Sequence, residues 1–142
     1  MKTPITRVVL DEHERQLIQA PLEMGWVVQG PYVKQFEEKF ARFMGAQFAV
    51  ATTSCTTALH LVLAALGVGP GDEVIVPAFT WVSTANVAVF QGATPVFCDI
   101  DLDTFNLDPQ QLEAKITPRT KAITTGEGGM ILTQDAERGV LC

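Results

Sequence analysis

The chain has 142 residues, of which 47% are hydrophobic and 18% charged, and its formal net charge at pH 7 is −6. This length predicts one compact domain, and the composition excludes an intrinsically disordered chain, which needs low hydrophobicity and high charge. No apolar run approaches the roughly 18 residues of a spanning helix, and the start turns acidic before a signal-peptide core develops. We therefore expect a cytoplasmic protein with no membrane partner.

The charge is distributed unevenly. Residues 1–71 carry six basic and six acidic side chains, whereas residues 72–142 carry four basic and ten acidic ones. An acidic half without a basic cluster disfavours nucleic acid as a partner. The three cysteines lack a CxxC spacing and the chain has only two histidines, so neither a metal site nor a disulfide framework is expected.

The hydrophobic pattern predicts alternating helices and strands. In chain order these are helices over 8–24 and 33–44, a strand over 48–52, a helix over 54–66, a strand over 73–79, a helix over 80–90, a strand over 94–100, and a helix with Asp108 as N-cap and Pro109 as first residue. In the second helix, apolar residues recur at three- and four-residue steps, so we expect its aromatic stripe to pack into a core. Strands and helices alternating at this spacing are typical of parallel βαβ units, so the fold class is α/β.

A run of hydroxyl residues, Thr52–Thr57, lies between a predicted strand and its helix. Hydroxyls and free backbone N–H groups at a helix N-terminus bind anions, and the helix dipole adds attraction. The segment lacks the Gly-x-x-x-x-Gly-Lys frame of a Walker loop. The alternative is a well-capped helix start without a ligand. Within the run, Cys55 has no His or Asn partner in view and is expected to be a small packing residue rather than a nucleophile.

Two further residues are candidates for a binding or catalytic role. Trp81 follows the strand over 73–79, where an indole either packs locally or stacks on a planar ligand, and position alone favours packing. Lys121 precedes a Gly-rich turn that feeds an apolar strand over 130–133, so burial could make it a Schiff-base amine, although a lone lysine is generally a solvated charge.

Long ordered strings carry a resemblance to a known family. They are VVQGPYVKQFEEKFA from residue 27, TTSCTTALHL from 52, GPGDEVIVPAFTWVSTAN from 69, GATPVFCDID from 92 and KAITTGEGGMILT from 121. The chain resembles the DegT/DnrJ/StrS family of pyridoxal-phosphate-dependent aminotransferases, which make amino sugars from nucleotide-linked keto sugars. The resemblance implies part of a fold-type-I large domain over residues 1–133, with parallel βαβ units in a three-layer αβα arrangement, and a divergent tail over 134–142.

The resemblance also implies a site and its partners. Ser54, Cys55 and Thr56 would bind the phosphate of pyridoxal 5'-phosphate, and Trp81 would stack on its pyridine ring. Lys121 aligns with the lysine that bonds to the cofactor in the motif K-x-I-T-T-G-E-G-G. The implied substrates are a nucleotide sugar and an amino acid, with glutamate as the amino donor, in a homodimer that serves polysaccharide biosynthesis.

The chain departs from the family pattern around Lys121. The family separates a K-A-I string that opens its fourth strand from the K-x-I-T-T of the reactive lysine, whereas here both merge at 120–124. Lys121 therefore has two origins that the sequence leaves open. The central strands, the carboxylate that pairs with the pyridinium nitrogen and the small domain are expected to be missing. The family's sheet order, 3-2-4-5-6-7-1, would then leave a 3-2 pair and a 7-1 pair without a sheet between them.

Three hypotheses follow. The first is a sugar aminotransferase. The second is a catalytically inactive fragment that at most binds pyridoxal phosphate or pairs with a full-length subunit. The third is a small non-enzymatic α/β protein that binds another phosphate. Because no residue replaces the pyridinium carboxylate, we expect the isolated chain to transaminate poorly or not at all, and no particular sugar is assigned.

Overall fold

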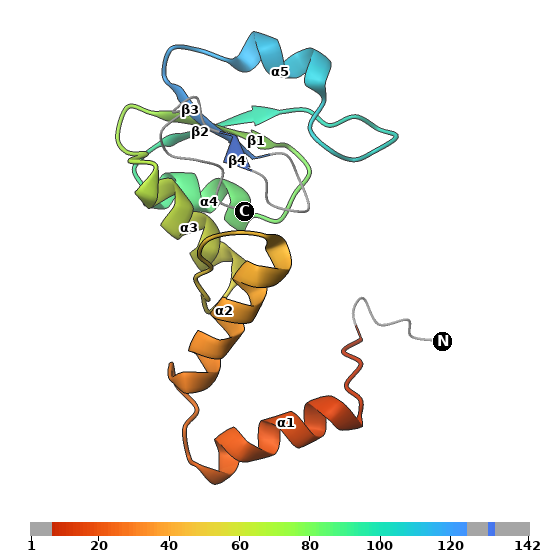
Figure 1. The fold of residues 1–142 in the computed structure, drawn as a ribbon. Coiled ribbons are helices and arrows are strands. Elements are labelled where there is room, and N and C mark those ends of the chain that lie inside the picture. The colour runs from red at the N-terminus through yellow and green to blue at the C-terminus, as the bar shows by residue number, and fades with distance from the viewer. Residues whose placement is uncertain (1–6, 125–130, 133–142) are drawn as a thin grey trace. The chain divides into compact units, whose positions relative to one another are not determined.

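Figure 1 presents a computed structural model, which describes residues 7–124 and 131–132. The chain divides into two compact units, residues 1–51 and 52–142. The first unit contains α1 (Glu12–Glu23) and α2 (Pro31–Met44). A capping box begins α1, because the Asp11 carboxylate accepts from the His13 N–H and Glu14 accepts from the Asp11 N–H, each at 2.8 Å. Pro31 opens α2, and the left-handed Gly45 (φ 67°) ends it.

Two expectations for the first unit are wrong. Residues 48–52 form no strand, and Phe48 is 75% exposed, because no described strand takes their backbone hydrogen bonds. Instead, the Ala51 N–H donates to Glu37 Oε1 at 2.8 Å. The aromatic stripe of α2 does not pack into a core either. Phe43 is 85% exposed and Ala41 is the only buried residue of this helix, since the rest of residues 7–51 offers α2 little apolar cover.

The second unit is built on one sheet. Its strands are β1 (Glu73–Pro77), β2 (Thr94–Cys98), β3 (Thr120–Thr124) and β4 (Ile131–Leu132), in the order β2-β1-β3-β4. The central strand β1 pairs in parallel with both β2 and β3, and β4 joins β3 antiparallel. The helices are α3 (Cys55–Ala65), α4 (Ser83–Phe90) and α5 (Pro109–Lys115). The α/β class is therefore confirmed, with Asp108 capping α5 as expected.

The core of the second unit lies on both faces of β1, all of whose residues are buried. Val74 and Val76 belong to a cluster with residues of α3 and α4, among them Leu63 and Val87. The intervening Ile75 belongs to a second cluster, which contains Cys98 and Leu107 and packs against Leu112 of α5. This alternation follows from the two-residue period of a strand. Figure 1 accordingly shows α3 and α4 on one face of the sheet and α5 on the other.

The expectation of two separate strand pairs is also wrong. Its 7-1 pair needed a strand over 48–52, which does not form, and β3 pairs directly with the edge of β1 that was expected to be open. Pairing satisfies a row of backbone groups that an open edge would leave to solvent.

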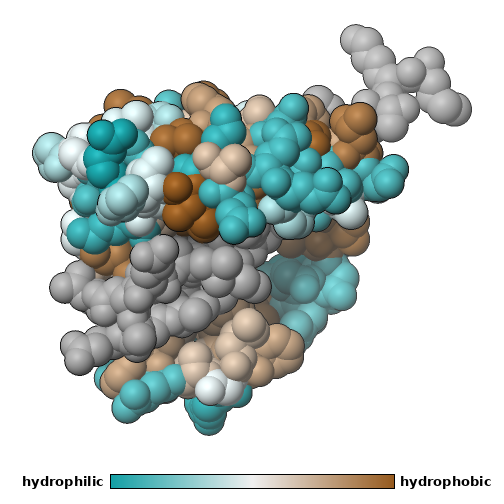
Figure 2. Space-filling view, turned by 90° about the horizontal axis from the view of Figure 1, so that it is seen from above, coloured by the Kyte–Doolittle hydropathy of each residue, from teal (hydrophilic) through white to brown (hydrophobic). Residues whose placement is uncertain are grey.

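In Figure 2, apolar side chains reach the surface among hydrophilic ones on the face that it shows. None of the helices in the described ranges is long and apolar enough to cross a bilayer.

Candidate cofactor site

The hydroxyl run gathers at the first turn of α3. Ser54 is the N-cap, and its Oγ accepts from the Thr57 N–H at 3.1 Å. The Thr57 Oγ1 lies 2.9 Å from Ser54 Oγ and 3.2 Å from Thr53 Oγ1. The first N–H groups of a helix have no intrahelical acceptor, and among the described residues nothing accepts from those of Cys55 and Thr56. This turn therefore presents free N–H groups beside three hydroxyls.

These groups suit a phosphate. The first turn of α3 contains no acidic residue, and Ser54 and Cys55 are exposed, so an anion meets neither repulsion nor a steric cover there. N–H groups at a helix N-terminus and the positive end of the dipole favour negative charge. By the chemistry of its donor set, the turn fits the phosphate group of a cofactor.

Trp81 lies in the segment between β1 and α4. Its carbonyl accepts from the Thr84 N–H at 3.0 Å, in the turn at which α4 begins. Trp81 itself is 72% exposed. The expectation of local packing is therefore wrong, because Trp81 stays largely exposed while Thr84 and Val87 of α4 are buried. An exposed aromatic face remains available for a planar ligand.

The first turn of α3 and Trp81 lie toward the same edge of the sheet. Trp81 follows β1, so it belongs to the edge at which β1 and β2 end, which we term the carboxyl edge. The C-terminus of α3 leads through a short turn into the beginning of β1, and Figure 1 shows α3 running back against β1. The N-terminus of α3 is thus directed toward the carboxyl edge. In open α/β sheets this is the edge at which ligands bind.

Lys121 lies at the opposite edge, where β1 begins, which we term the amino edge. Its Nζ is 3.6 Å from Asp72 Oδ2, and the residue directly precedes the buried Ala122 in β3. Between the pairs Glu73↔Thr120 and Val74↔Ala122 the register advances by one residue on β1 and two on β3, so Lys121 is the extra residue of a bulge. The structure brings Ser54, Cys55 and Thr56 together, directs them toward the edge that carries Trp81, and holds Lys121 apart from them.

A second polar cluster at the amino edge was not anticipated. The buried Glu73 accepts from Thr117 Oγ1 at 2.5 Å and from Arg119 Nε at 2.9 Å. The hydrogen bond from Thr117 and then that from Arg119 lower the pKa of the Glu73 carboxyl, while burial opposes them. A glutamate at the head of an apolar strand was the available signal, since a buried carboxylate requires partners.

Other candidate groups do not form a site. Burial raises the pKa of the Cys98 thiol, and Cys55 and Cys98 are both unbridged. No three His, Cys, Asp or Glu side chains are grouped as metal ligands within the described ranges. The Gly-rich turn over 125–130 and the tail over 134–142 lie outside the described residues.

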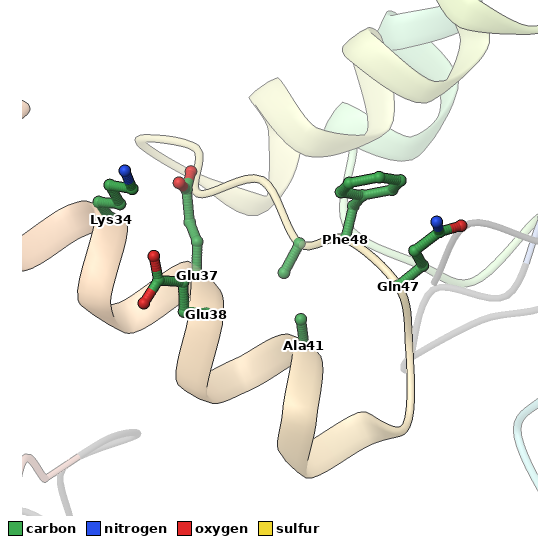
Figure 3. Close-up of a pocket in the computed structure, with 7 residues that line it drawn as sticks. Lys34, Glu37, Glu38, Ala41, Gln47 and Phe48 are labelled. Atoms are coloured by element: carbon green, nitrogen blue, oxygen red, sulfur yellow. The ribbon is translucent and has the colours of Figure 1, made fainter.

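Figure 3 shows an open hollow of about 200 Å³ within the first unit. Its lining combines two turns of α2 with the segment that follows the helix: Lys34, Glu37, Glu38, Ala41, Gln47, Phe48 and Ala49. Glu37 is already engaged by the Ala51 N–H. The hollow thus marks where the segment after α2 folds back along the helix, and it gathers no nucleophile or metal-ligand set.

The fold and the first turn of α3 define an α/β protein that presents free backbone N–H groups and hydroxyls toward the carboxyl edge of its sheet. A sequence model of the DegT/DnrJ/EryC1/StrS aminotransferase family matches residues 8–124. The chain belongs to this family.

Known relatives agree with this assignment. The chain is 51% identical over 134 residues to the spore coat polysaccharide biosynthesis protein SpsC of Bacillus subtilis strain 168, covering 94% of this chain and 34% of SpsC. A solved 3-amino-5-hydroxybenzoic acid synthase is 44% identical with a TM-score of 0.76, over 92% of this chain and 34% of that one. A solved GDP-4-keto-6-deoxymannose-3-dehydratase with a trapped PLP–glutamate geminal diamine is 37% identical with a TM-score of 0.79, over 87% and 34%. The chain thus spans about a third of the length of these relatives.

Proposed function

We propose that this chain supplies the cofactor-phosphate site of a pyridoxal-phosphate-dependent sugar aminotransferase. Ser54, Cys55 and Thr56 would hold the phosphate, and Trp81 would stack on the pyridine ring. The observation that carries the proposal is the first turn of α3, where the N–H groups of Cys55 and Thr56 have no acceptor among the described residues. Family membership supplies the identity of the ligand.

For the whole protein, the proposal is transfer of an amino group from glutamate to a nucleotide-linked keto sugar, in a cytoplasmic homodimer. Bound pyridoxal phosphate supplies an electron sink for such a transfer. The first turn of α3 would fix the cofactor at its phosphate end, through hydroxyls and backbone N–H groups that need no charged side chain. Trp81 would fix the tilt of the ring. The trapped glutamate in the related dehydratase supports glutamate as the donor.

A second candidate is binding of the cofactor without turnover. The position of Lys121 favours it, because the lysine ammonium lies at the amino edge beside Asp72 and not toward Trp81. The two candidates share the phosphate site and differ only in whether an amino group is transferred when glutamate is added.

The proposal predicts that Thr56→Val weakens binding of pyridoxal phosphate about 10-fold, because a hydrogen bond to a charged group is lost while the shape of the side chain is kept. Ser54→Ala should act in the same direction and also lower the stability of α3, whose N-cap it removes. Binding is measured by calorimetry with pyridoxal phosphate and, separately, with inorganic phosphate.

Two controls sharpen this test. Thr94→Val, an identical change at an exposed position of β2, should leave both affinities unchanged. Trp81→Leu should weaken binding of pyridoxal phosphate but not of inorganic phosphate, since only the former has a ring to stack. Equal affinities for the wild type and Thr56→Val would exclude the Thr56 hydroxyl as a phosphate ligand, and a wild-type chain that binds neither ligand would contradict the site at the first turn of α3.

A further inference from the structure

We propose that Lys121 is a positioning residue of the sheet, paired with Asp72, and that it does not bond covalently to the cofactor in this chain. The inference rests on the proposed function in one respect, because it takes the first turn of α3 as the place where the cofactor is held. Its geometric basis is independent of that function and lies entirely within the described residues of the second unit.

The register that places Lys121 is fixed by specific contacts. The Glu73 N–H donates to the Arg119 carbonyl at 2.8 Å, directly before β3 begins. The Glu73 side chain returns to the same turn, where it accepts from Thr117 and Arg119. Both the backbone and the side chain of Glu73 therefore hold residues 117–119 against the start of β1. These contacts hold the first residues of β3 at the amino edge.

Asp72 holds Lys121 at the same edge. One carboxylate oxygen of Asp72 accepts from the Gly69 N–H at 2.9 Å, so the turn before β1 orients the carboxylate. The same oxygen lies 3.6 Å from Lys121 Nζ. The bulge frees the lysine from the regular strand pairing and allows its side chain to lie against the carboxylate.

The distance along the sheet separates this lysine from the proposed cofactor. From Glu73 to Pro77, β1 rises about 13 Å. Trp81 lies beyond Pro77, whereas Asp72 lies before Glu73, so the ammonium group is directed away from the carboxyl edge. Moving Lys121 to that edge would require β3 to slip along β1, which would break the contacts of Glu73 and move the buried Ala122 and Thr124 out of register.

The family match agrees with this placement. It runs from residue 8 to residue 124 and so includes the whole of β3. In the structure, residues 120–124 form the strand that follows α5. Of the two origins that the sequence leaves open, this corresponds to the lysine that opens a strand.

A double-mutant cycle tests the pairing. Lys121→Met keeps the length of the side chain, and Asp72→Asn keeps an oxygen for the Gly69 N–H, so each removes mainly the charge pair. Each variant should lower the thermal midpoint by about 2–4 °C, and the double variant should lower it no further. The coupling should shrink in high salt, since both side chains are partly exposed. Additive shifts would overturn the inference.

Labelling tests the second half of the inference. The wild-type chain is incubated with pyridoxal phosphate, reduced with borohydride and mapped by peptide mass spectrometry, with the exposed Lys115 as the internal reference. We expect Lys121 to be labelled no more than Lys115, and labelling to be the same in Thr56→Val. Modification concentrated on Lys121 and lost in Thr56→Val would overturn the inference.

The two proposals fail in different ways. If the wild-type chain binds neither pyridoxal phosphate nor inorganic phosphate, the proposed function fails, while the cycle between Lys121 and Asp72 still reports the ion pair. If phosphate binds at the first turn of α3 and Lys121 is selectively labelled, the function stands and the inference falls. Lys121→Met should also leave the affinity for pyridoxal phosphate within two-fold of the wild type, which a covalent role for the lysine would not allow.

Discussion

Replacing Ile75 with alanine is expected to lower the free energy of unfolding of the second unit by about 2–5 kcal/mol. Ile75 is fully buried at the centre of β1, with 0% of its surface exposed. It packs with Cys98 and Leu107 on the face that α5 covers. Truncation to alanine removes buried methyl and methylene groups and leaves a cavity that a close-packed interior closes only in part.

The measurement is urea denaturation followed by circular dichroism. Ile116→Ala, the same change at a residue that is 41% exposed, is the matched control. It should lower the free energy of unfolding by well under half as much as Ile75→Ala does. If the two variants unfold at the same urea concentration, β1 is not the core strand of this unit. Because Ile75→Ala changes no charged group, the loss in the free energy of unfolding should not depend on salt.

The sequence predicted those elements whose signals are local. Gly45 ends α2, Ser54 caps α3, and Asp108 with Pro109 starts α5, each as a short stretch of chain dictates, whereas α2 begins at Pro31, two residues before the predicted start. The apolar run of β1 was also predictable as a strand, because a strand buried on both faces is continuously hydrophobic. Class and order of elements follow from such signals without knowledge of the neighbours.

What the sequence could not predict depends on neighbours. Residues 48–52 have the composition of a strand, but a strand exists only where another strand accepts and donates its hydrogen bonds. The stripe on α2 is apolar, yet Phe36 and Phe40 stay exposed, with their ring centroids 5.7 Å apart. Periodicity reports which face of a helix is apolar and does not report what covers it.

In the candidate site, too, groups that are neighbours in the sequence were predictable, and groups that strand pairing brings together were not. The donors at the first turn of α3 are consecutive in the sequence, so their grouping was predictable. The position of Lys121 depends on pairing between residues 73 and 120, which a motif cannot encode. The cluster of Glu73, Thr117 and Arg119 was missed for the same reason, since Glu73 lies 44 residues before Thr117 and 46 before Arg119 in the chain.

Glu73→Gln is expected to lower the thermal midpoint by about 4–8 °C at pH 7, because the Thr117 hydroxyl and the Arg119 guanidinium would then face a neutral amide. Glu113→Gln, the same change on the exposed face of α5, should shift it by less than about 2 °C. The midpoint is measured by circular dichroism from pH 7 down to pH 3. A Glu73→Gln midpoint equal to that of the wild type at pH 7 would contradict a stabilising role for the bonds from Thr117 and Arg119 to the ionised carboxylate.

The pH dependence of that difference follows from the direction of the pKa shift. The hydrogen bonds from Thr117 and then Arg119 hold the pKa of the Glu73 carboxyl below its ordinary value of about 4.3. The stability that ionised Glu73 contributes is therefore fully present above the pKa of the unfolded chain and is lost as the pH falls through the lower folded-state pKa. The wild type should approach Glu73→Gln only below about pH 4.3. Hydrogen bonds from Thr104 also lower the pKa of Asp101, so protonation of Asp101 in acid destabilises the wild type and Glu73→Gln alike. The difference between their two midpoints therefore reports Glu73 alone.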